Sequence, residues 1–297
     1  MYHQVDKERF DNQMKYLKNN YNVISLEEFV KTFKEKRKFK KNTVVITFDD
    51  GYLNNYINVF PILKKYRLPS TMFVITGLIG TNKLAWWDEI KFAILKTDKN
   101  KYTFEFKGRT INLDLSNEQK RLEEFIVIHK LVSKYNFKLR QEATKKINRD
   151  LKSKKLEGNP ENYRFMNWDQ IMELSNNNIE IGAHSITHPY LSNIPKREMI
   201  KEIKDCKIFI EEKIQKPVKS FCYPSGDTTK DISNLVKNIG YTSAYTTKMG
   251  QITNDSNPYA LERIGINVFD DLPVFSIKLT KMWTFIISKL KNDNNES

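Results

Sequence analysis

The sequence predicts an α/β fold built around a parallel sheet. Two short runs rich in β-branched and apolar residues, 43–47 and 71–76, are separated by a segment with helical spacing, as in a strand–helix–strand unit. The same alternation resumes after residue 165 and continues to about residue 268. Seven or so such units predict either a closed barrel or an open doubly wound sheet.

The N-terminal part begins with predicted helices at 7–19 and 25–33 around a short strand at 23–24. The strand at 43–47 leads into a helix at 54–66, and the strand at 71–76 completes the unit. Pro61 lies inside this helix and predicts a late start or a kink, because proline lacks the N–H that an inner helical turn requires.

The C-terminal part repeats the pattern. A helix at 168–175 precedes a strand at 179–183, and an amphipathic helix at 196–216 precedes a strand at 218–223. A helix at 231–239 is expected to stop at Gly240, since glycine readily adopts the left-handed conformation that ends helices. Strands at 241–246 and 263–268 complete the series.

Residues 98–164 interrupt this alternation and are interpreted as an insertion within a single domain of residues 1–297. The segment holds 17 Lys and Arg residues against 10 Asp and Glu residues. Its net charge of +7 is half of the net charge of the chain, +14. It contains a predicted hairpin at 102–113, turning at Lys107 and Gly108, and a helix at 118–135. We expect a solvated or substrate-facing surface, with His129 exposed to solvent.

The whole chain of 297 residues carries a net charge of +14, which favours anionic partners. It contains no helix-turn-helix, RNP or zinc-finger pattern, so no nucleic acid partner is expected. The two cysteines, Cys206 and Cys222, cannot form a disulfide framework. The first ten residues lack the apolar core of a signal peptide, and we therefore expect a cytoplasmic protein.

Residues 272–291 form a predicted amphipathic helix with lysines beside its apolar side chains. Such a helix can lie in a membrane interface, which predicts peripheral contact with the inner face of the cell membrane. The alternative is a final helix that packs on its own domain. No run of 18 uncharged apolar residues is present, so no membrane span is predicted.

Asp49 and Asp50 stand side by side at the end of the predicted strand 43–47. Their side chains would point to opposite faces if the strand continued, but Gly51 permits a sharp bend that turns both into one pocket. The carboxyl ends of parallel strands are where α/β enzymes place their sites. The alternative is an ordinary turn, because Asp-Gly pairs are common in turns.

His184 and His188 follow the predicted strand 179–183 and are four residues apart. Gly182 and Pro189 argue against a helix here, so we expect a loop that bends back. Two imidazoles and one carboxylate form a facial triad that leaves metal positions open for water and substrate. Two surface histidines without a ligand are the alternative.

Three stretches of the sequence, residues 45–52, 184–188 and 221–226, resemble the successive motifs of polysaccharide deacetylases. This family is carbohydrate esterase family 4, also called the NodB-homology fold. The resemblance covers nearly all the chain outside the insertion, and it implies a distorted (β/α)7 barrel.

The resemblance implies that Asp50, His184 and His188 bind a divalent metal ion, with zinc as the expected ion, and that Asp49 is the general base. A divalent cation lowers the pKa of its water, and a carboxylate beside it can take the proton. The backbone N–H of Tyr223 is the implied donor to the oxyanion.

No histidine follows His188, where many family members have their general acid. The segment Tyr2-His3 is similar to an N-terminal segment of permuted poly-N-acetylglucosamine deacetylases, which makes His3 the candidate acid. Arg263 resembles a recurrent arginine at a strand start. It is expected either to orient Asp49 or to form an ordinary surface ion pair.

These observations predict a metal-dependent N-deacetylase of an N-acetylated amino sugar in a bacterial envelope glycan or its lipid-linked precursor. A deacetylase of peptidoglycan or of an exported exopolysaccharide is the alternative within the same fold. A basic protein that binds nucleic acid or glycan without catalysis is the alternative outside it.

Overall fold

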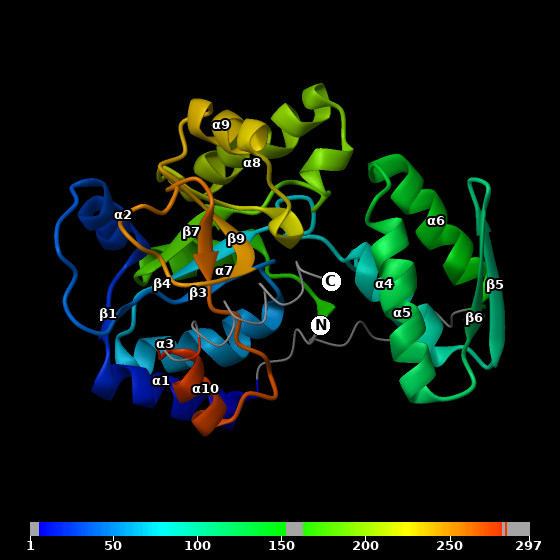
Figure 1. Cartoon of the computed structure of the whole chain (residues 1–297), viewed down its shortest axis with the longest axis horizontal. Coiled ribbons are helices and arrows are strands. Elements are labelled where there is room, and N and C mark those ends of the chain that lie inside the picture. The colour runs from blue at the N-terminus through cyan, green and yellow to red at the C-terminus, as the bar shows by residue number, and fades with distance from the viewer. Residues whose placement is uncertain (1–5, 153–162, 281–282, 284–297) are drawn as a thin grey trace, which may run out of the picture.

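Six parallel strands form the central sheet of the computed structural model, which describes residues 6–152, 163–280 and 283 (Figure 1). The strand order is β10-β9-β8-β7-β4-β3. The strands are β3 (Thr47–Phe48), β4 (Ser70–Val74), β7 (Ile179–Ala183), β8 (Ser220–Cys222), β9 (Ser243–Met249) and β10 (Leu261–Arg263). The predicted α/β class with a parallel sheet is confirmed.

The sheet curls, so that its two edge strands approach each other. β3 and β10 lie at opposite ends of the strand order. The guanidinium of Arg263 on β10 nevertheless donates a hydrogen bond to the Thr47 hydroxyl on β3, with Nη1 3.1 Å from Oγ1. A flat six-stranded sheet could not bring these residues into contact, because neighbouring strands are about 4.8 Å apart. The curvature agrees with the barrel-like architecture implied by the resemblance.

The predicted strand 43–47 is divided into two short strands. β2 (Thr43–Val44) pairs with β1 (Asn22–Val23), whereas β3 pairs with β4. The chain bends between them because the Val44 carbonyl accepts from Ile24, and the Ile46 carbonyl accepts from Thr71 on β4. The bend transfers the chain from the small two-stranded sheet to the main one and directs the end of β3 toward the site.

Helices surround the curled sheet (Figure 1). They are α1 (Lys7–Asn20), α2 (Leu26–Lys34), α3 (Phe60–Tyr66), α7 (Trp168–Asn176), α8 (Lys196–Ile214) and α9 (Lys230–Asn238). The helix predicted at 54–66 does not start late, since the chain is helical from residue 53. It takes a π-helical turn, Asn55–Val59, before the regular α-helix resumes at Phe60, next to Pro61. This irregularity is the distortion expected from the proline. Gly240 lies just beyond α9 with a left-handed φ of 97°, as expected.

The insertion forms a lobe with a hydrophobic cluster of its own (Figure 1). Its elements are α4 (Trp86–Lys96), β5 (Lys101–Phe106), β6 (Arg109–Asp114), α5 (Glu118–Val132) and α6 (Phe137–Asp150). The cluster extends upstream of the boundary expected at about residue 98, because α4 supplies Ile90, Ala93 and Ile94. The predicted hairpin turn is confirmed: Lys107 and Gly108 have φ values of 51° and 72°, as a tight hairpin requires. Neither α4 nor α6 was predicted from the sequence.

The described part of the predicted C-terminal helix is α10 (Leu272–Lys278), which packs on α1. Phe275 is buried and its ring contacts that of Tyr16 edge-on at 6.3 Å. Apart from Trp283, residues 281–291 of the expected helix lie outside the described residues. Within the described ranges, no helix combines the length and apolar character needed to cross a membrane.

Candidate active site

The residues singled out by the motifs meet at one edge of the sheet. Asp49 and Asp50 follow β3, His184 follows β7, and Tyr223 follows β8. Arg263 is the last residue of β10. All these strands are parallel, so their carboxyl ends lie at the same edge. The fold thereby assembles side chains that are more than 200 residues apart in the sequence.

Asp50, His184 and His188 form a compact group of metal-ligating atoms, all within 4.8 Å of one another. Asp50 Oδ1 lies 3.4 Å from Nε2 of His184 and 3.8 Å from Nε2 of His188. Asp50 and Gly51 have left-handed φ values of 74° and 87°. The bend expected from Gly51 is therefore present, and it places the Asp50 carboxylate opposite the two imidazoles.

The orientation of the His184 ring leaves Nε2 available as a ligand. Its Nδ1 lies 2.7 Å from the carbonyl oxygen of Cys222, which can only accept, so Nδ1 carries the proton and donates it. In the neutral form of the ring, which is the form that binds a metal, the lone pair of Nε2 faces Asp50. A buried histidine fixed in this way through its second nitrogen is the usual arrangement of a metal ligand.

The electrostatics differ between the two histidines. Burial lowers the pKa of His188 to about 3, and the neighbouring His184 contributes to this effect, so that His188 is neutral at physiological pH. Burial also opposes the charged form of His184, but Cys222 and the carboxylate of Asp50 outweigh it and raise the pKa of this residue.

The two histidines converge through a loop and not through a helix, as predicted. Ser185 and His188 adopt left-handed φ values of 63° and 54°. The Ser185 hydroxyl accepts a hydrogen bond from the His188 N–H at 3.0 Å. Glu202 on α8 accepts from the N–H groups of Ile186 and Thr187 at 2.7 and 2.9 Å. These bonds fold the segment back on itself and bring His188 beside His184.

Asp49 is held by a bidentate pair with Arg263, with Nη1–Oδ1 and Nη2–Oδ2 distances of 2.8 and 2.7 Å. Burial raises the pKa of Asp49, but the charge and hydrogen bonds of Arg263 more than offset it and hold this pKa well below its ordinary value. Asp49 is thus anionic at neutral pH and can accept a proton. Arg263 is largely buried and also binds the Thr246 carbonyl, so the expected contact with Asp49 is observed and is not a surface ion pair.

A second group of potential ligand atoms, from Asp49, His184 and Cys222, also lies within 4.8 Å. In this group the carboxylate is already paired with Arg263 and Nδ1 of His184 is engaged with the Cys222 carbonyl. The Asp50, His184 and His188 group has no such competing contacts at its Nε2 atoms among the described hydrogen bonds. Its two nitrogens and one carboxylate fit a divalent cation.

The expectation for Tyr223 is wrong. Its backbone N–H donates to the Tyr245 carbonyl on β9 at 3.0 Å, within the ladder between β8 and β9, so it is not available to an oxyanion. Pro224 has no N–H, and Ser225 follows with a left-handed φ of 54°. Among the described residues, no backbone partner of the Ser225 N–H is found, which leaves it as a candidate donor.

A sequence profile described as polysaccharide deacetylase matches residues 36–244. The chain belongs to this family. The match includes Asp49, Asp50, His184 and His188, and ends before Arg263. It also spans the insertion, so this member carries a lobe within its family domain.

A named relative is the poly-beta-1,6-N-acetyl-D-glucosamine N-deacetylase of Staphylococcus aureus, 37% identical over 123 residues. The matched region covers 40% of this chain and 42% of that protein, so the likeness spans less than half of either.

Two solved structures share the fold over almost the whole chain. The Streptococcus pyogenes deacetylase PplD, solved in complex with acetate, covers 93% of this chain and 88% of its own, with a TM-score of 0.62 and 19% identity. IcaB from Ammonifex degensii covers 92% and 89%, with a TM-score of 0.59 and 16% identity.

Several residues of this polysaccharide deacetylase family member were missed as parts of the site. The ring of Trp87 lies against that of His188, with centroids 4.6 Å apart, and its indole N–H donates to the Tyr52 hydroxyl at 2.9 Å. Tyr52 in turn donates to Asp88 at 2.8 Å. The signal for Tyr52 was its position two residues after Asp50.

Burial raises the pKa of Asp88 to about 7, and the nearby charge of Asp50 adds to this shift, whereas the hydrogen bond from Tyr52 opposes it. The series of contacts from His188 through Trp87 and Tyr52 therefore ends at the Asp88 carboxyl group, which is half protonated near neutral pH.

The expectation that His129 is exposed to solvent is wrong. Its ring stacks on Trp86 with centroids 5.0 Å apart and an interplanar angle of 12°. Burial lowers its pKa to about 4. His129 is thus a neutral packing residue of the insertion. His3, the candidate general acid, lies outside the described residues.

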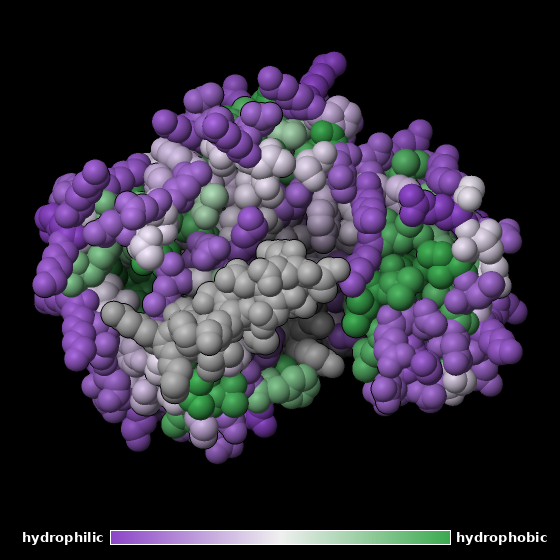
Figure 2. Space-filling view, in the orientation of Figure 1, coloured by the Kyte–Doolittle hydropathy of each residue, from purple (hydrophilic) through white to green (hydrophobic). Residues whose placement is uncertain are grey.

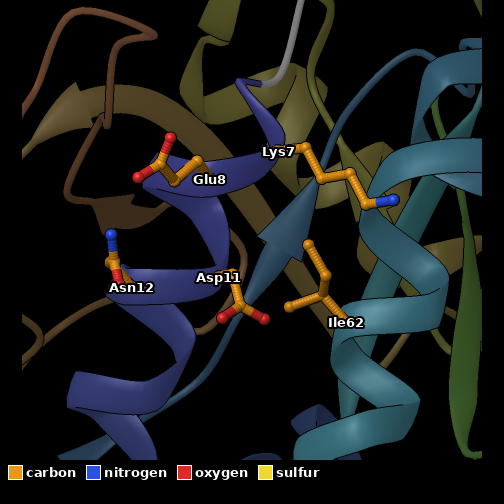
Figure 3. Close-up of a pocket in the computed structure, with 5 residues that line it drawn as sticks. All are labelled: Lys7, Glu8, Asp11, Asn12 and Ile62. Atoms are coloured by element: carbon orange, nitrogen blue, oxygen red, sulfur yellow. The ribbon is translucent and has the colours of Figure 1, made fainter.

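A surface pocket between α1 and α3 is lined by Lys7, Glu8, Asp11, Asn12 and Ile62 (Figure 3). None of the motif residues lines this pocket. Of its two acidic residues, Glu8 and Asp11, the second is paired with Lys65 at 2.7 Å.

Proposed function

We propose that this protein is a metal-dependent N-deacetylase that hydrolyses the acetamide of an N-acetylated amino-sugar glycan. One observation carries the proposal: two adjacent carboxylates have separate surroundings. Asp50 faces the imidazoles of His184 and His188, whereas Asp49 is held by the guanidinium of Arg263. A single site thus contains a set of metal ligands and, beside it, an anionic base that is not one of them.

The reaction requires a nucleophilic water, a proton acceptor and stabilisation of the developing oxyanion. A divalent cation in such a triad supplies Lewis-acid polarisation and makes water more acidic. Asp49 takes the proton of the attacking water, and Arg263 keeps its carboxylate ionised and correctly oriented. We assign the backbone contribution to the oxyanion to the Ser225 N–H in place of Tyr223.

Departure of the amine requires a proton, and we assign its delivery to His3 on the basis of the N-terminal resemblance. Zinc is the expected ion, since two imidazoles and one carboxylate are a common zinc donor set, although other divalent ions use it too. Metal analysis of the purified protein decides between them.

The Staphylococcus aureus relative is named for poly-β-1,6-N-acetylglucosamine, which makes oligomers of that polymer the first substrate to test. Peptidoglycan fragments and a lipid-linked N-acetylated amino sugar are the second and third. All three present the same acetamide on a hexosamine, so the site chemistry is common to them and the glycan context distinguishes them.

The test measures metal content and acetate release for the parent and for Asp49→Asn on these three substrates. The neutral amide keeps the size of the side chain but cannot accept the proton, so we expect metal retention with turnover reduced at least about 100-fold. Asp114→Asn, an exposed carboxylate on β6, is the matched control and should keep parental turnover. Full activity in Asp49→Asn, or a parent that binds no divalent ion, would overturn the proposal.

We further propose that the protein touches a membrane surface through the exposed side of α10. Apolar side chains gather over this helix (Figure 2). Five of them around α10 are exposed: Ile266, Phe269, Leu272, Val274 and Ile277. Lys278, expected among the basic residues, is instead buried and paired with Asp270. The described surface is therefore apolar and not basic.

Vesicle sedimentation tests this contact. We expect Val274→Ser combined with Ile277→Ser to reduce binding to anionic phospholipid vesicles, because it removes apolar area that would enter the interface. The matched pair on the insertion, Ile126→Ser with Val127→Ser, should bind like the parent. Equal binding by all three proteins would contradict the proposal. Location of the protein at the inner face of the cell membrane stays a prediction. Fractionation of cells tests it.

A further inference from the structure

The peptide between Thr187 and His188 is held by an arginine from the insertion. Arg140 lies on α6 and is 1% exposed. Its Nη1 donates to the His188 carbonyl at 2.7 Å, and its Nη2 donates to the Thr187 carbonyl at 3.1 Å and to the Thr187 hydroxyl at 3.3 Å. The insertion therefore contacts the backbone of a metal-ligand residue directly.

The same loop is held from its other side by Glu202 on α8. Glu202 accepts from the N–H groups of Ile186 and Thr187 and from the Thr187 hydroxyl. Glu202 of the central domain thus holds the N–H groups of Ile186 and Thr187, and Arg140 of the insertion holds the carbonyls of Thr187 and His188. Arg140 binds the peptides that precede and follow His188, and Glu202 binds the two peptides before them.

These contacts matter because His188 adopts the left-handed backbone conformation. A non-glycine residue in that region costs roughly 1 kcal/mol or more, and it persists when surrounding contacts enforce it. Without Arg140, the carbonyls on both sides of His188 would lose these bonds, and the backbone at His188 would be held less firmly. The imidazole would then sample positions away from Asp50 and His184.

Hydrogen bonds within the insertion do not explain the presence of Arg140. Within the described residues, its side chain donates to backbone carbonyls of the loop of the central domain, and its guanidinium lies 5.6 Å from the ring centre of Trp86. Arg121 provides the contrast: it also binds carbonyls, but those of Leu95, Lys99 and Leu115, all within the insertion. Burial disfavours the charged form of Arg140 and lowers its pKa to about 10. The guanidinium nevertheless stays charged at neutral pH.

We propose that Arg140 is a positioning residue of the metal centre, and that the insertion thereby forms part of that centre. The inference rests on the proposed function, since it concerns the metal triad of Asp50, His184 and His188. It assigns to the insertion a role in metal affinity that does not require contact with the glycan.

The experiment measures Zn²⁺ affinity by competition with a chromogenic chelator, using the full-length parent, Arg140→Met, Arg140→Lys and Arg121→Met. Methionine keeps the apolar stem of arginine but loses its donors. We expect Arg140→Met to bind Zn²⁺ about 10- to 100-fold more weakly, the usual effect of removing a group that orients a ligand. Arg140→Lys should lose less, because it keeps the charge and a donor but not the fork. Arg121→Met should bind within about twofold of the parent.

Two further measurements separate positioning from general destabilisation. Urea unfolding of the metal-free proteins compares the stability lost in Arg140→Met with that lost in Arg121→Met. The visible absorption of the Co²⁺ forms reports the ligand arrangement, and we expect it to change in Arg140→Met but not in Arg121→Met. A variant that is destabilised without a change in Zn²⁺ affinity or Co²⁺ spectrum would have lost packing alone.

The outcomes distinguish this inference from the proposed function. Parental Zn²⁺ affinity in Arg140→Met, or an equal loss in Arg121→Met, would overturn the positioning role while the deacetylase proposal stands. A parent that binds no divalent ion would overturn both. An active parent with normal metal content, combined with weakened binding in Arg140→Met alone, supports both.

Discussion

Arg263 and Asp49 form a two-point pair across the open edge of the curled sheet, with N–O distances of 2.7 and 2.8 Å. Arg263 ends β10 and Asp49 follows β3, and these strands are the two outermost ones of the sheet. The same contact therefore closes the curvature of the fold and sets the protonation state of the proposed base.

Replacing Arg263 should impair both roles of this pair. In Arg263→Met the pKa of Asp49 rises, because burial is no longer offset by the guanidinium. We expect kcat/KM to fall about 10- to 100-fold and the acid limb of its pH profile to move to higher pH. The pH dependence of acetate release measures both. An unchanged acid limb would show that Arg263 does not control the ionisation of the base, and Arg121→Met is the control for loss of an arginine elsewhere.

His3→Ala should separate proton delivery from metal binding. We expect turnover to fall about 100-fold or more with Zn²⁺ content unchanged, since an acid is needed to release the amine but not to ligate the ion. His129→Ala is the control for loss of a histidine outside the site. Unchanged turnover in His3→Ala would exclude His3 as the acid.

Asp88 should make stability depend on pH. Its pKa is raised from 3.8 to about 7 in the folded protein, so the folded state retains a proton that the unfolded chain releases. The free energy of unfolding therefore falls as pH rises from about 4 to about 7, and the effect is constant above that range. Asp88→Asn, neutral throughout, lacks this contribution.

Relative to the parent, Asp88→Asn should gain up to about 4 kcal/mol of stability between pH 4 and pH 7, at 1.36 kcal/mol per pKa unit. Urea unfolding at several pH values measures the difference. Parallel pH profiles for the two proteins would contradict the shift.

Gly182 on β7 lies where no side chain fits. A Cβ there would meet two ring carbons of the fully buried Phe73 at 2.4 and 2.5 Å. We expect Gly182→Ala to lose about 1 to 3 kcal/mol of stability. Gly265→Ala is the control, since a Cβ at that position meets nothing within 4 Å and should change stability by less than about 0.5 kcal/mol. Thermal unfolding compares them, and equal melting temperatures would contradict the packing argument.

The parts of the site that follow strand ends could be predicted from sequence. Asp49 and Asp50 end an apolar run, and His184 and His188 follow another, so the periodicity that identifies buried strands also locates these residues. Gly51 indicated the bend at Asp50, and its φ of 87° confirms it.

Contacts that involve backbone groups could not be predicted in this way. Arg140 binds carbonyls of a loop 47 and 48 residues away, and a carbonyl has no side-chain signature in the sequence. The Tyr223 expectation failed for the same reason, because the Tyr245 carbonyl on β9 uses its N–H. Only the strand register shows which backbone groups are already paired.

His129 shows a further limit. Its neighbours on α5 include charged residues, and this pattern indicated an exposed helix face. The insertion has its own core, however, and Trp86 of α4 covers the ring. The burial of His129 depends on α4, a helix that was not predicted from the sequence.

The left-handed backbone at Asp50 and His188 changes the meaning of an alanine substitution at either position. Aspartate, asparagine and histidine tolerate this conformation better than alanine does. Alanine would therefore remove a ligand atom and relax the main chain at once, whereas asparagine would keep the local conformation. At these two positions the amino acid suits the backbone conformation as well as the site, and asparagine is the replacement that removes the native ligand group while keeping that conformation.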